Sequence, residues 1–472
     1  MLFYFAINQV SAQWQSEVRL TSNDSLSFVS RGNTWSIASQ SSNVHVVLWD
    51  NRDGNYEIYY TRSTNAGATW EPDIRLTNNP AISGSSSIAA SGDTVHVVWN
   101  DNRTVNWGLY YKRSTNAGIS WSEDTLLTPN GNIGPTTICS DGSAVHVAWS
   151  DARDGNDEIY YMHSSDGGTT WSADSRLTFD SALSEYPSIT VSGSTVHVVW
   201  WDSRDVDWEI YYKRSTDGGS TWEADNRLTN SPGYSQLPSI GASGSSVHVV
   251  WSDDRDGNQE IYYKRSTDAG LTWSVDSRLT NDPASQGIPC IAVSGSNIHT
   301  VWNDYRDSDF EIYYKFSTDD GTSWSSDTRL TNAPGTSWSP SLAVSGTAIH
   351  VVWGDSRDGN DEIYYKRNPT GNPTAIIEPT ESTVPNAFEL FHNYPNPFNP
   401  TTTIRFSLPR SEFVTLKVFD ALGSQVALLV SESLPPGTYN AQWNAHGFSS
   451  GMYFYRLQTT TFTQTAKLIL LR

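Results

Sequence analysis

Short runs of alternating apolar and polar residues dominate the chain, and one apolar string returns at a nearly constant interval. The string VHVVW, or a close variant, recurs with spacings of 50 or 51 residues. Its histidines are His45, His96, His146, His197, His248, His299 and His350. No long segment has the 3.6-residue period of an amphipathic helix. The pattern therefore predicts an all-β fold made of repeated units.

Each unit contains four β-branched or aromatic runs separated by Ser-Gly, Asp-Gly or Ala-Gly turns. In one unit the predicted strands are Ser239–Ala242, Val247–Trp251, Glu260–Lys264 and Trp273–Leu279. Four antiparallel strands per unit, repeated seven times, are typical of β-propeller blades. We therefore expect a seven-bladed β-propeller over residues 14–367.

The two ends of this repeat complement each other. Trp14–Thr21 resembles the outer strand Trp171–Thr178 of a later unit, and the seventh unit stops after Arg367 without such a strand. We expect the N-terminal strand Trp14–Thr21 to complete the last blade, which closes the ring and removes an unpaired sheet edge.

The regions outside the repeat have a different composition. Residues 368–387 are rich in Pro and Thr and predict a linker. Residues 388–472 predict a small immunoglobulin-like β-sandwich. Its expected strands are Thr403–Leu408, Val414–Phe419, Thr438–Trp443, Met452–Gln458 and Thr465–Leu471. Residues 1–13 predict a signal peptide truncated at its start, with a plain hydrophobic tail as the alternative.

Charge and composition exclude several classes of partner. The chain has 30 Lys and Arg against 51 Asp and Glu, a net charge of −21, so we expect no nucleic-acid partner. No apolar run approaches the roughly 20 residues that span a bilayer, so we expect no transmembrane span. The two cysteines, Cys139 and Cys290, are expected to be small buried residues.

Six units carry a Ser-x-Asp/Asn-x-Gly-x-Thr/Ser-Trp hairpin. Its Asp or Asn side chain can accept hydrogen bonds from turn amides, its Gly tolerates a positive φ, and its Trp packs on neighbouring strands. The six Asp or Asn residues are Asn65, Asn116, Asp166, Asp217, Asp268 and Asp319. The motif closely resembles the Asp-box, or BNR repeat, of the sialidase-like superfamily. The resemblance implies a structural role, away from the catalytic face.

The same resemblance raises the question of a sialidase active site. Such enzymes use three arginines, a Tyr/Glu nucleophile pair and an Asp acid/base at non-equivalent positions. Here 18 of the 19 arginines in residues 14–367 fall into three repeated classes, and only Arg31 is unique. A catalytic centre needs different groups that converge. We therefore expect no catalytic residue, and an exo-sialidase-type glycoside hydrolase is the alternative.

A second repeated cluster, Asp-x-Arg-Asp-Gly-Asn-x-Glu, lies between the second and third strands of a unit, as in Asp253–Glu260. Either these loops bind Ca²⁺ or a glycan, or the Arg pairs with the neighbouring carboxylates, and we favour the second interpretation. The histidines, one per blade, predict hydrogen-bonded strand residues rather than metal ligands. We expect no metal and no cofactor, with Ca²⁺ as the alternative.

Aromatic residues that depart from the repeat are the candidates for ligand binding. Rings stack on the apolar faces of sugars while carboxylates accept hydroxyl hydrogens, although packing between blades is the alternative. The candidates are Tyr56, Trp107, Trp208, Phe310, Trp201 and Trp338, with Tyr186, Tyr234 and Tyr305 in loops of the same face.

The C-terminal module carries a further resemblance. The runs Asn393–Thr402, Asp420–Gly423, Gly437–Tyr439 and Ser450–Tyr453 resemble the type A sorting domain of the type IX secretion system. The resemblance implies export by that machinery through residues 388–472, to the medium or the outer-membrane surface of a bacterium. We expect a secreted or cell-surface propeller that binds an extracellular glycan or protein. A structural scaffold without a small-molecule site is a further alternative.

Overall fold

The computed structural model describes residues 14–30, 35–104, 106–129, 131–369, 385–399, 401–423, 425–434, 436–445 and 448–471. The predicted signal peptide and most of the predicted linker lie outside the described residues. Every element in the described parts is a strand, which confirms the all-β prediction. The described residues contain no helix that is long and apolar enough to cross a membrane. The chain divides into two compact units, formed mainly by residues 17–366 and 367–472.

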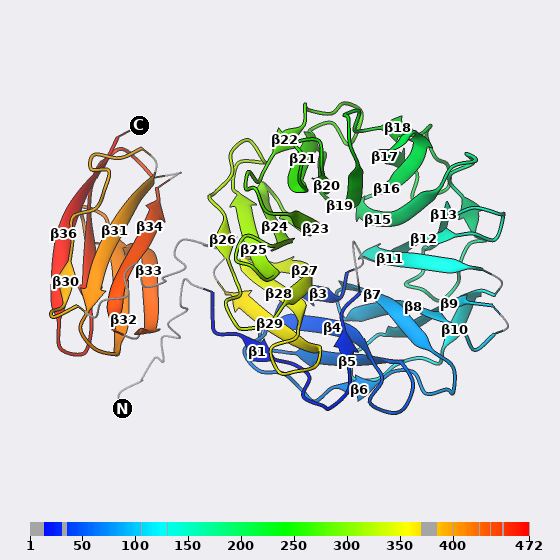
Figure 1. Cartoon of the computed structure of the whole chain (residues 1–472), viewed down its shortest axis with the longest axis horizontal. Coiled ribbons are helices and arrows are strands. Elements are labelled where there is room, and N and C mark those ends of the chain that lie inside the picture. Colours follow the sequence, from blue (N-terminus) through cyan, green and yellow to red (C-terminus); the bar gives the residue numbers. More distant parts are fainter. Residues whose placement is uncertain are drawn as a thin grey trace. The chain divides into compact units, whose positions relative to one another are not determined.

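Figure 1 shows the strands of the first unit as sheets arranged in a ring around a central axis. The described residues form seven such sheets in this unit, which we number as blades 1 to 7. Blade 1 contains β2 (Ser27–Phe28), β3 (Ile37–Gln40), β4 (Asn43–Asp50), β5 (Glu57–Ser63) and β6 (Ile74–Arg75). Blade 2 contains β7 (Ser83–Ser91), β8 (Thr94–Asp101), β9 (Gly108–Ser114) and β10 (Thr125–Thr128). Blade 3 contains β11 (Ile133–Asp141), β12 (Ala144–Asp151), β13 (Glu158–Ser164) and β14 (Ser175–Arg176).

The remaining blades follow the same order of strands. Blade 4 contains β15 (Ser184–Ser192), β16 (Thr195–Asp205), β17 (Asp207–Ser215) and β18 (Asn226–Arg227). Blade 5 contains β19 (Ser235–Ser243), β20 (Ser246–Asp253), β21 (Glu260–Ser266) and β22 (Ser277–Arg278). Blade 6 contains β23 (Gln286–Ser294), β24 (Asn297–Asp304), β25 (Glu311–Ser317) and β26 (Thr328–Arg329). Blade 7 contains β27 (Ser337–Ser345), β28 (Ala348–Asp355), β29 (Glu362–Asn368) and β1 (Val18–Arg19).

The N-terminal strand closes the ring as predicted. β1 pairs with β29 in an antiparallel register that sets Val18 opposite Tyr365 and Arg19 opposite Tyr364. The Arg19 guanidinium also lies 2.8 Å from the buried carboxylate of Glu362. The outer edge of the last blade is therefore covered by residues more than 340 positions away in the sequence.

The outer strands are shorter than the sequence predicts. In blade 5 the outer strand β22 is only Ser277–Arg278, whereas the expected strand began at Trp273. The difference arises because the Trp273 ring leaves the sheet and packs edge-on against Tyr212 of blade 4, with centroids 5.0 Å apart. The aromatic residue that suggested a strand is thus part of a contact between blades.

Apolar clusters between successive blades form the core of the propeller. Between blades 1 and 2 the buried side chains include Val47, Ile58, Val97 and Trp99. The Trp of the second strand is fully buried in six blades, at Trp99, Trp149, Trp200, Trp251, Trp302 and Trp353. Cys290 is buried and Cys139 is half-buried, and both are free thiols. Each blade therefore buries its apolar side chains against the next blade rather than within a separate core.

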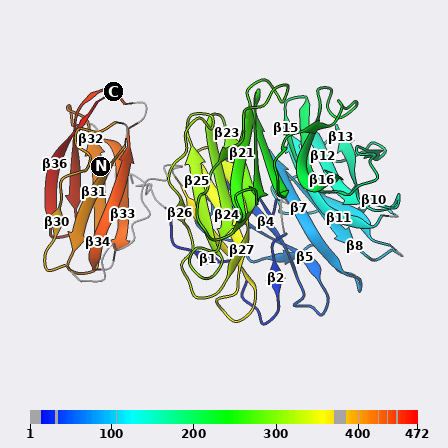
Figure 2. The same cartoon turned by 45° about the horizontal axis from the view of Figure 1, so that its top comes forward.

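The second unit is a β-sandwich of two antiparallel sheets, whose strands run alongside one another in Figure 2. One sheet contains β30 (Glu389–Leu390), β31 (Thr401–Leu408) and β34 (Gly437–Asn444). The other contains β33 (Gln425–Leu434), β32 (Glu412–Phe419), β35 (Gly451–Gln458) and β36 (Thr463–Leu470). Both sheets bury side chains in one apolar core, including Phe406, Leu416 and Tyr455. The strands β30 and β33 were missed by the sequence analysis.

Candidate functional site

A buried Asp lies at or near the end of the second strand of every blade and is held by the Arg two residues later. In blade 5 the Asp253 carboxylate accepts hydrogen bonds from Arg255 Nη2 at 2.5 Å and Trp251 Nε1 at 2.8 Å. Burial acts to raise the pKa of Asp253, but the hydrogen bonds from Arg255 and Trp251 outweigh it, so the pKa is lowered. Arg255 also pairs with Asp276 at 2.8 Å and lies 4.3 Å from the ring centroid of Tyr262. The arginine of this loop is therefore a structural residue.

The other positive charges of the propeller are bound in the same way. Residues 14–367 hold 24 Lys and Arg, of which Arg31 lies outside the described residues. Each of the others contacts a carboxylate, a carbonyl or another side-chain oxygen. The described part of the propeller thus offers no set of three uncommitted arginines that could grip a ligand carboxylate.

The repeated histidines are hydrogen-bonded strand residues, as predicted, and their partners are tyrosines. The Nδ1 atom of each lies 2.6 or 2.7 Å from a Tyr hydroxyl in the third strand of the same blade, as for His96 and Tyr111. Burial lowers the pKa to about 4 for His45, His96, His146, His197, His248 and His299. Among the residues that the structure describes, no group of three or more His, Cys, Asp or Glu could hold a metal ion.

The Asp-box hairpins join neighbouring blades. In blade 5 the Asp268 carboxylate accepts hydrogen bonds from the Thr272 hydroxyl and backbone amide, which lower its pKa to about 2. Gly270 has a φ of 85°, and a Cβ there would lie 1.9 Å from the hydroxyl of Tyr212 in blade 4. These hairpins follow the third strand, at the end opposite to the Asp-x-Arg turns. They therefore position blades and lie far from the loops that carry the candidate aromatics.

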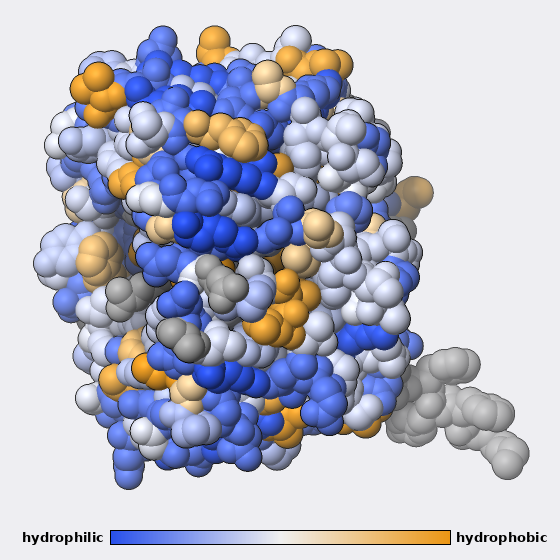
Figure 3. Space-filling model, turned by 90° about the vertical axis from the view of Figure 1, so that its right-hand side faces the viewer, coloured by the Kyte–Doolittle hydropathy of each residue, from blue (hydrophilic) through white to orange (hydrophobic). Residues whose placement is uncertain are grey.

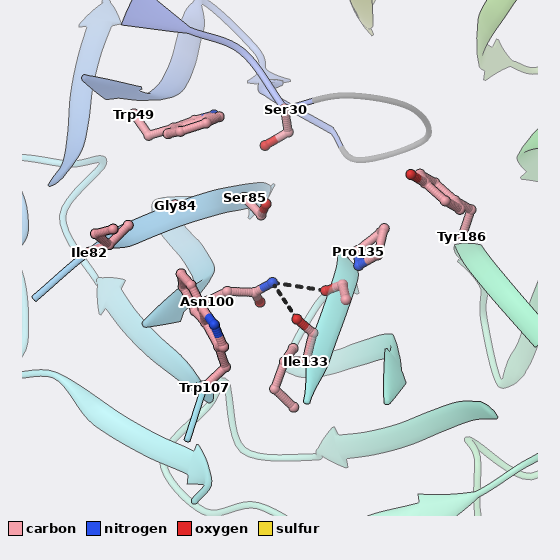
Figure 4. A pocket seen from close by; sticks show the side chains of 11 residues that line it. Ser30, Trp49, Ile82, Gly84, Ser85, Asn100, Trp107, Ile133, Pro135 and Tyr186 are labelled. Carbon is pink, nitrogen blue, oxygen red and sulfur yellow. Dashed lines mark hydrogen bonds between the residues drawn. The ribbon is translucent and has the colours of Figure 1, made fainter. Parts of the chain in front are cut away.

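A pocket on the opposite end is an opening of about 530 Å³, lined by residues of blades 1 to 4. Figure 4 shows Trp49 and Trp107 on one side and Tyr186 of blade 4 across the opening. The lining also includes Ile82, Ile133 and Pro135 with the polar side chains of Ser30, Ser85 and Asn100. Asn100 Nδ2 donates to Gly134 O at 2.8 Å, which fixes the amide in the floor of the pocket. Small-ligand sites have this size and this mixture of aromatic walls and few polar groups.

Tyr186 reaches the pocket from a strained backbone position. Its φ is 52°, and the pairing of β15 with β16 shifts register between Glu185 and Ser188. A bulge of this kind re-aims a side chain, and a left-handed φ is costly for a bulky residue. The same bulge recurs with a positive φ at Ser85, Leu237, Ile288 and Ser339. The repeated bulge thus places one variable side chain per blade at this end of the propeller.

The six predicted aromatic residues occupy different environments. Only Trp107 lines the pocket. The others contact further rings: Tyr56 with Trp49 at 4.8 Å, Trp208 with Trp201 at 4.8 Å, Phe310 with Tyr305 at 5.0 Å and Trp338 with Phe28 at 5.7 Å. All six are half-buried except Phe310, which is 36% exposed.

Sequence reasoning missed Trp49 and Asn100 as pocket residues. Both stand immediately before the buried Asp of the second strand. Five blades have a small or polar residue at this position, and the other two have Trp49 and Trp201. Trp49 could have been identified because a Trp at this position departs from the repeat, whereas Asn100 has the same residue type as blade 6 and does not stand out.

A pair of carboxyl groups lies next to Tyr186. Glu185 in β15 is hydrogen-bonded to Asp157, which precedes β13 in blade 3. Burial and the neighbouring Asp157 carboxylate raise the pKa of Glu185 to about 7. Burial also raises the pKa of Asp157. The pair can therefore hold a proton near neutral pH.

The outer edge of the propeller on the side of blades 2 to 4 faces the viewer in Figure 3. Figure 3 shows this side as mainly hydrophilic, with separate hydrophobic spots. The exposed apolar residues of blades 2 and 3 include Ile119, Leu126 and Phe179. Single exposed apolar residues are normal and do not mark a site.

Comparisons with known proteins identify the C-terminal unit and the fold of the rest. Residues 392–471 match the model of the secretion system C-terminal sorting domain. No curated protein sequence matches the chain. The polysaccharide lyase Uly1 is similar in structure at 10% identity and a TM-score of 0.53, over 76% of this chain and 99% of that chain. At this identity the likeness concerns the fold alone.

Two further solved structures have lower TM-scores. A protein of unknown function from Dyadobacter fermentans has 13% identity and a TM-score of 0.47, over 62% of this chain and 96% of that one. A sialidase from Trypanosoma rangeli has 11% identity and a TM-score of 0.45, over 97% of this chain and 89% of that one.

The Asp-box propeller and the sorting domain together define the class of protein. The sorting domain directs the chain to the type IX secretion system, which exports it to the surface of a bacterium or the medium. The chain is thus an exported bacterial β-propeller protein.

Proposed function

We propose that the propeller binds an uncharged extracellular glycan in the pocket lined by blades 1 to 4. The observation that carries this proposal is a pocket walled by the rings of Trp49, Trp107 and Tyr186 and floored by the Asn100 amide. Aromatic faces stack on the apolar faces of sugar rings, and hydroxyl groups exchange hydrogen bonds with Ser and amide groups.

The charge of the propeller supports an uncharged ligand over an acidic one. The residues before 388 hold 24 basic and 47 acidic side chains. Every described cation of the propeller is already bound to an oxygen of the protein. A sialic or uronic acid carboxylate would therefore approach a negative surface without a free partner.

The test is a glycan array that displays neutral and acidic glycans, together with a fluorogenic sialoside assay. Trp107→Ala should lose at least about tenfold in affinity, because truncation of an aromatic residue at a binding hot spot costs about 2 kcal/mol or more. The control is Phe179→Ala, which removes a ring that is 73% exposed in the connection between β14 and β15 and does not line the pocket. It should bind like the unmodified protein.

Four results would contradict the proposal. Trp107→Ala could retain full binding, or it could lose binding and melting temperature together, which would make Trp107 a packing residue. A preference for acidic glycans, or cleavage of the sialoside, would favour the exo-sialidase alternative.

A further inference from the structure

We infer that the pocket is one end of an aromatic track, Trp49, Trp107, Tyr186, Trp201 and Trp208, that binds successive units of a polysaccharide chain rather than a terminal monosaccharide. This inference rests on the proposed function, since it specifies the length of the bound glycan.

Tyr186 connects the pocket to a second group of rings in blade 4. Its ring lines the pocket and also packs edge-on against Trp201, with centroids 4.9 Å apart and planes at 84°. Trp201 in turn lies 4.8 Å from Trp208, with planes at 33°. The rings of Tyr186, Trp201 and Trp208 therefore contact one another in succession, from the pocket along blade 4.

Blade 4 differs from its neighbours at the hairpin that carries Trp208. In blade 3 the turn residue Asn156 donates to Ala182 O at 2.6 Å and so ties the turn to the next connection. Blade 4 has Asp207 at this position, and its strand pairing continues further into the hairpin, because β16 extends to Asp205 and pairs with Asp207. The tip residue Val206 is 94% exposed and has a φ of 82°. A β-branched residue in this conformation is strained, and such strain is characteristic of functional loops.

Hydrogen-bonding groups stand at the middle of the track. Glu185 precedes Tyr186 in β15 and contacts Asp157 across the junction of blades 3 and 4. Carboxyl oxygens beside a stacking ring are suited to the hydroxyl groups of a sugar. The track therefore offers rings at both ends and polar groups between them, as a chain of linked sugars requires.

Blade 6 provides a matched position outside the track. Phe310 occupies the same place in its hairpin as Trp208, and its ring lies 5.0 Å from Tyr305. Neither ring contributes to the lining of the pocket. Phe310→Ala is thus the control for Trp208→Ala.

The test measures affinity by calorimetry for cello-, xylo- and manno-oligosaccharides of one to six units, with the full chain. In the unmodified protein the affinity should rise at least about tenfold between one and four units. Trp208→Ala should abolish this rise and leave the affinity for the shortest ligand unchanged, as expected for the loss of one stacking ring. Trp208→Phe should restore it, and Phe310→Ala should behave like the unmodified protein.

The outcomes separate this inference from the proposed function. Affinity that does not depend on length overturns the track and leaves the pocket in place. An equal loss in Trp208→Ala and Phe310→Ala also overturns it, since equivalent positions around the ring would then carry binding. Failure of every oligosaccharide to bind overturns the proposed function and the track together.

Discussion

Gly118 of blade 2 lies directly against the hydroxyl group of Tyr60 in blade 1. A Cβ on Gly118 would lie 1.9 Å from Tyr60 Oη, and Tyr60 Oη is itself 2.6 Å from His45 Nδ1. The same contact joins Gly67 to Tyr365, Gly168 to Tyr111, Gly219 to Tyr161, Gly270 to Tyr212 and Gly321 to Tyr263. In each Asp-box blade, the Asp-box glycine therefore leaves the space into which the tyrosine hydroxyl of the preceding blade packs.

This contact predicts that Gly118→Ala destabilises the propeller strongly. Its φ of 83° disfavours any side chain by about 1–2 kcal/mol, and the collision with Tyr60 adds about 1–3 kcal/mol. Gly92→Ala is the control, because Gly92 has a φ of 60° but open space around it. It should lose only the conformational part. Urea unfolding of both variants measures the difference, and equal losses would show that Tyr60 can move aside.

The closing strand predicts that removal of residues 14–21 exposes β29. A chain that begins at Ser22 lacks the partner of Tyr364 and Tyr365 and leaves Glu362 without Arg19. Losing one partner of a buried ion pair costs about 3–5 kcal/mol, and a free strand edge favours association. Compared with a chain that begins at Gln13, it should melt at a lower temperature and elute as oligomers. An unchanged monomer with the same melting temperature would contradict the closure.

The buried histidines predict that the propeller loses stability as the pH falls from about 6.5 to 4. Their pKa is about 4 when folded and near 6.5 when exposed, so the unfolded chain binds more protons in this window. Each proton taken up lowers the free energy of unfolding by about 1.4 kcal/mol per pH unit. Denaturant unfolding at several pH values measures the slope, which should correspond to several protons. His96→Gln should reduce it by about one proton, and a flat profile would contradict the assignment.

Glu185 predicts a pH effect of the opposite sign. Its pKa is about 7 when folded against an ordinary value near 4.5, so the folded chain binds more protons between these values. The stability that this proton provides is present below pH 4.5 and is lost as the pH rises through 7. Glu185→Gln should remove this loss in melting curves taken between pH 5 and 8. The exposed residue Glu123, changed to Gln, is the control, and an identical pH profile for both variants would exclude the Asp157 pair as its source.

The architecture could be predicted because the repeat is nearly perfect. The interval between the histidines and the complementary ends of the repeat were enough to predict blades and the closing strand. The outer strands were overestimated because Trp273 belongs to a contact between blades and not to β22. The strand β33 was missed because bulges interrupt its pairing with β32 and break the alternation of apolar positions.

The candidate site could be predicted only in part. Trp107 was identified because it departs from the repeat, but its role in a pocket depends on Trp49, Asn100 and Tyr186 from other blades. Ring closure also brings Phe28 within 5.7 Å of Trp338, which lies 310 residues later. Which rings face an opening and which cover each other depends on bulges and on this long-range contact, and neither is visible in a local pattern.

Because each Asp-box blade receives its neighbour through the same glycine, tyrosine and histidine, these junctions are chemically interchangeable. The repeat begins and ends in blade 7, which carries no Asp-box hairpin and combines β1 with β27, β28 and β29. New termini could be placed in one of the six Asp-box hairpins, with residues 14 and 367 joined by a short peptide. The resulting circular permutant of the propeller would keep the same glycine–tyrosine contacts in the same order. In such an architecture the loops at the pocket end can vary in sequence while the contacts between blades stay the same.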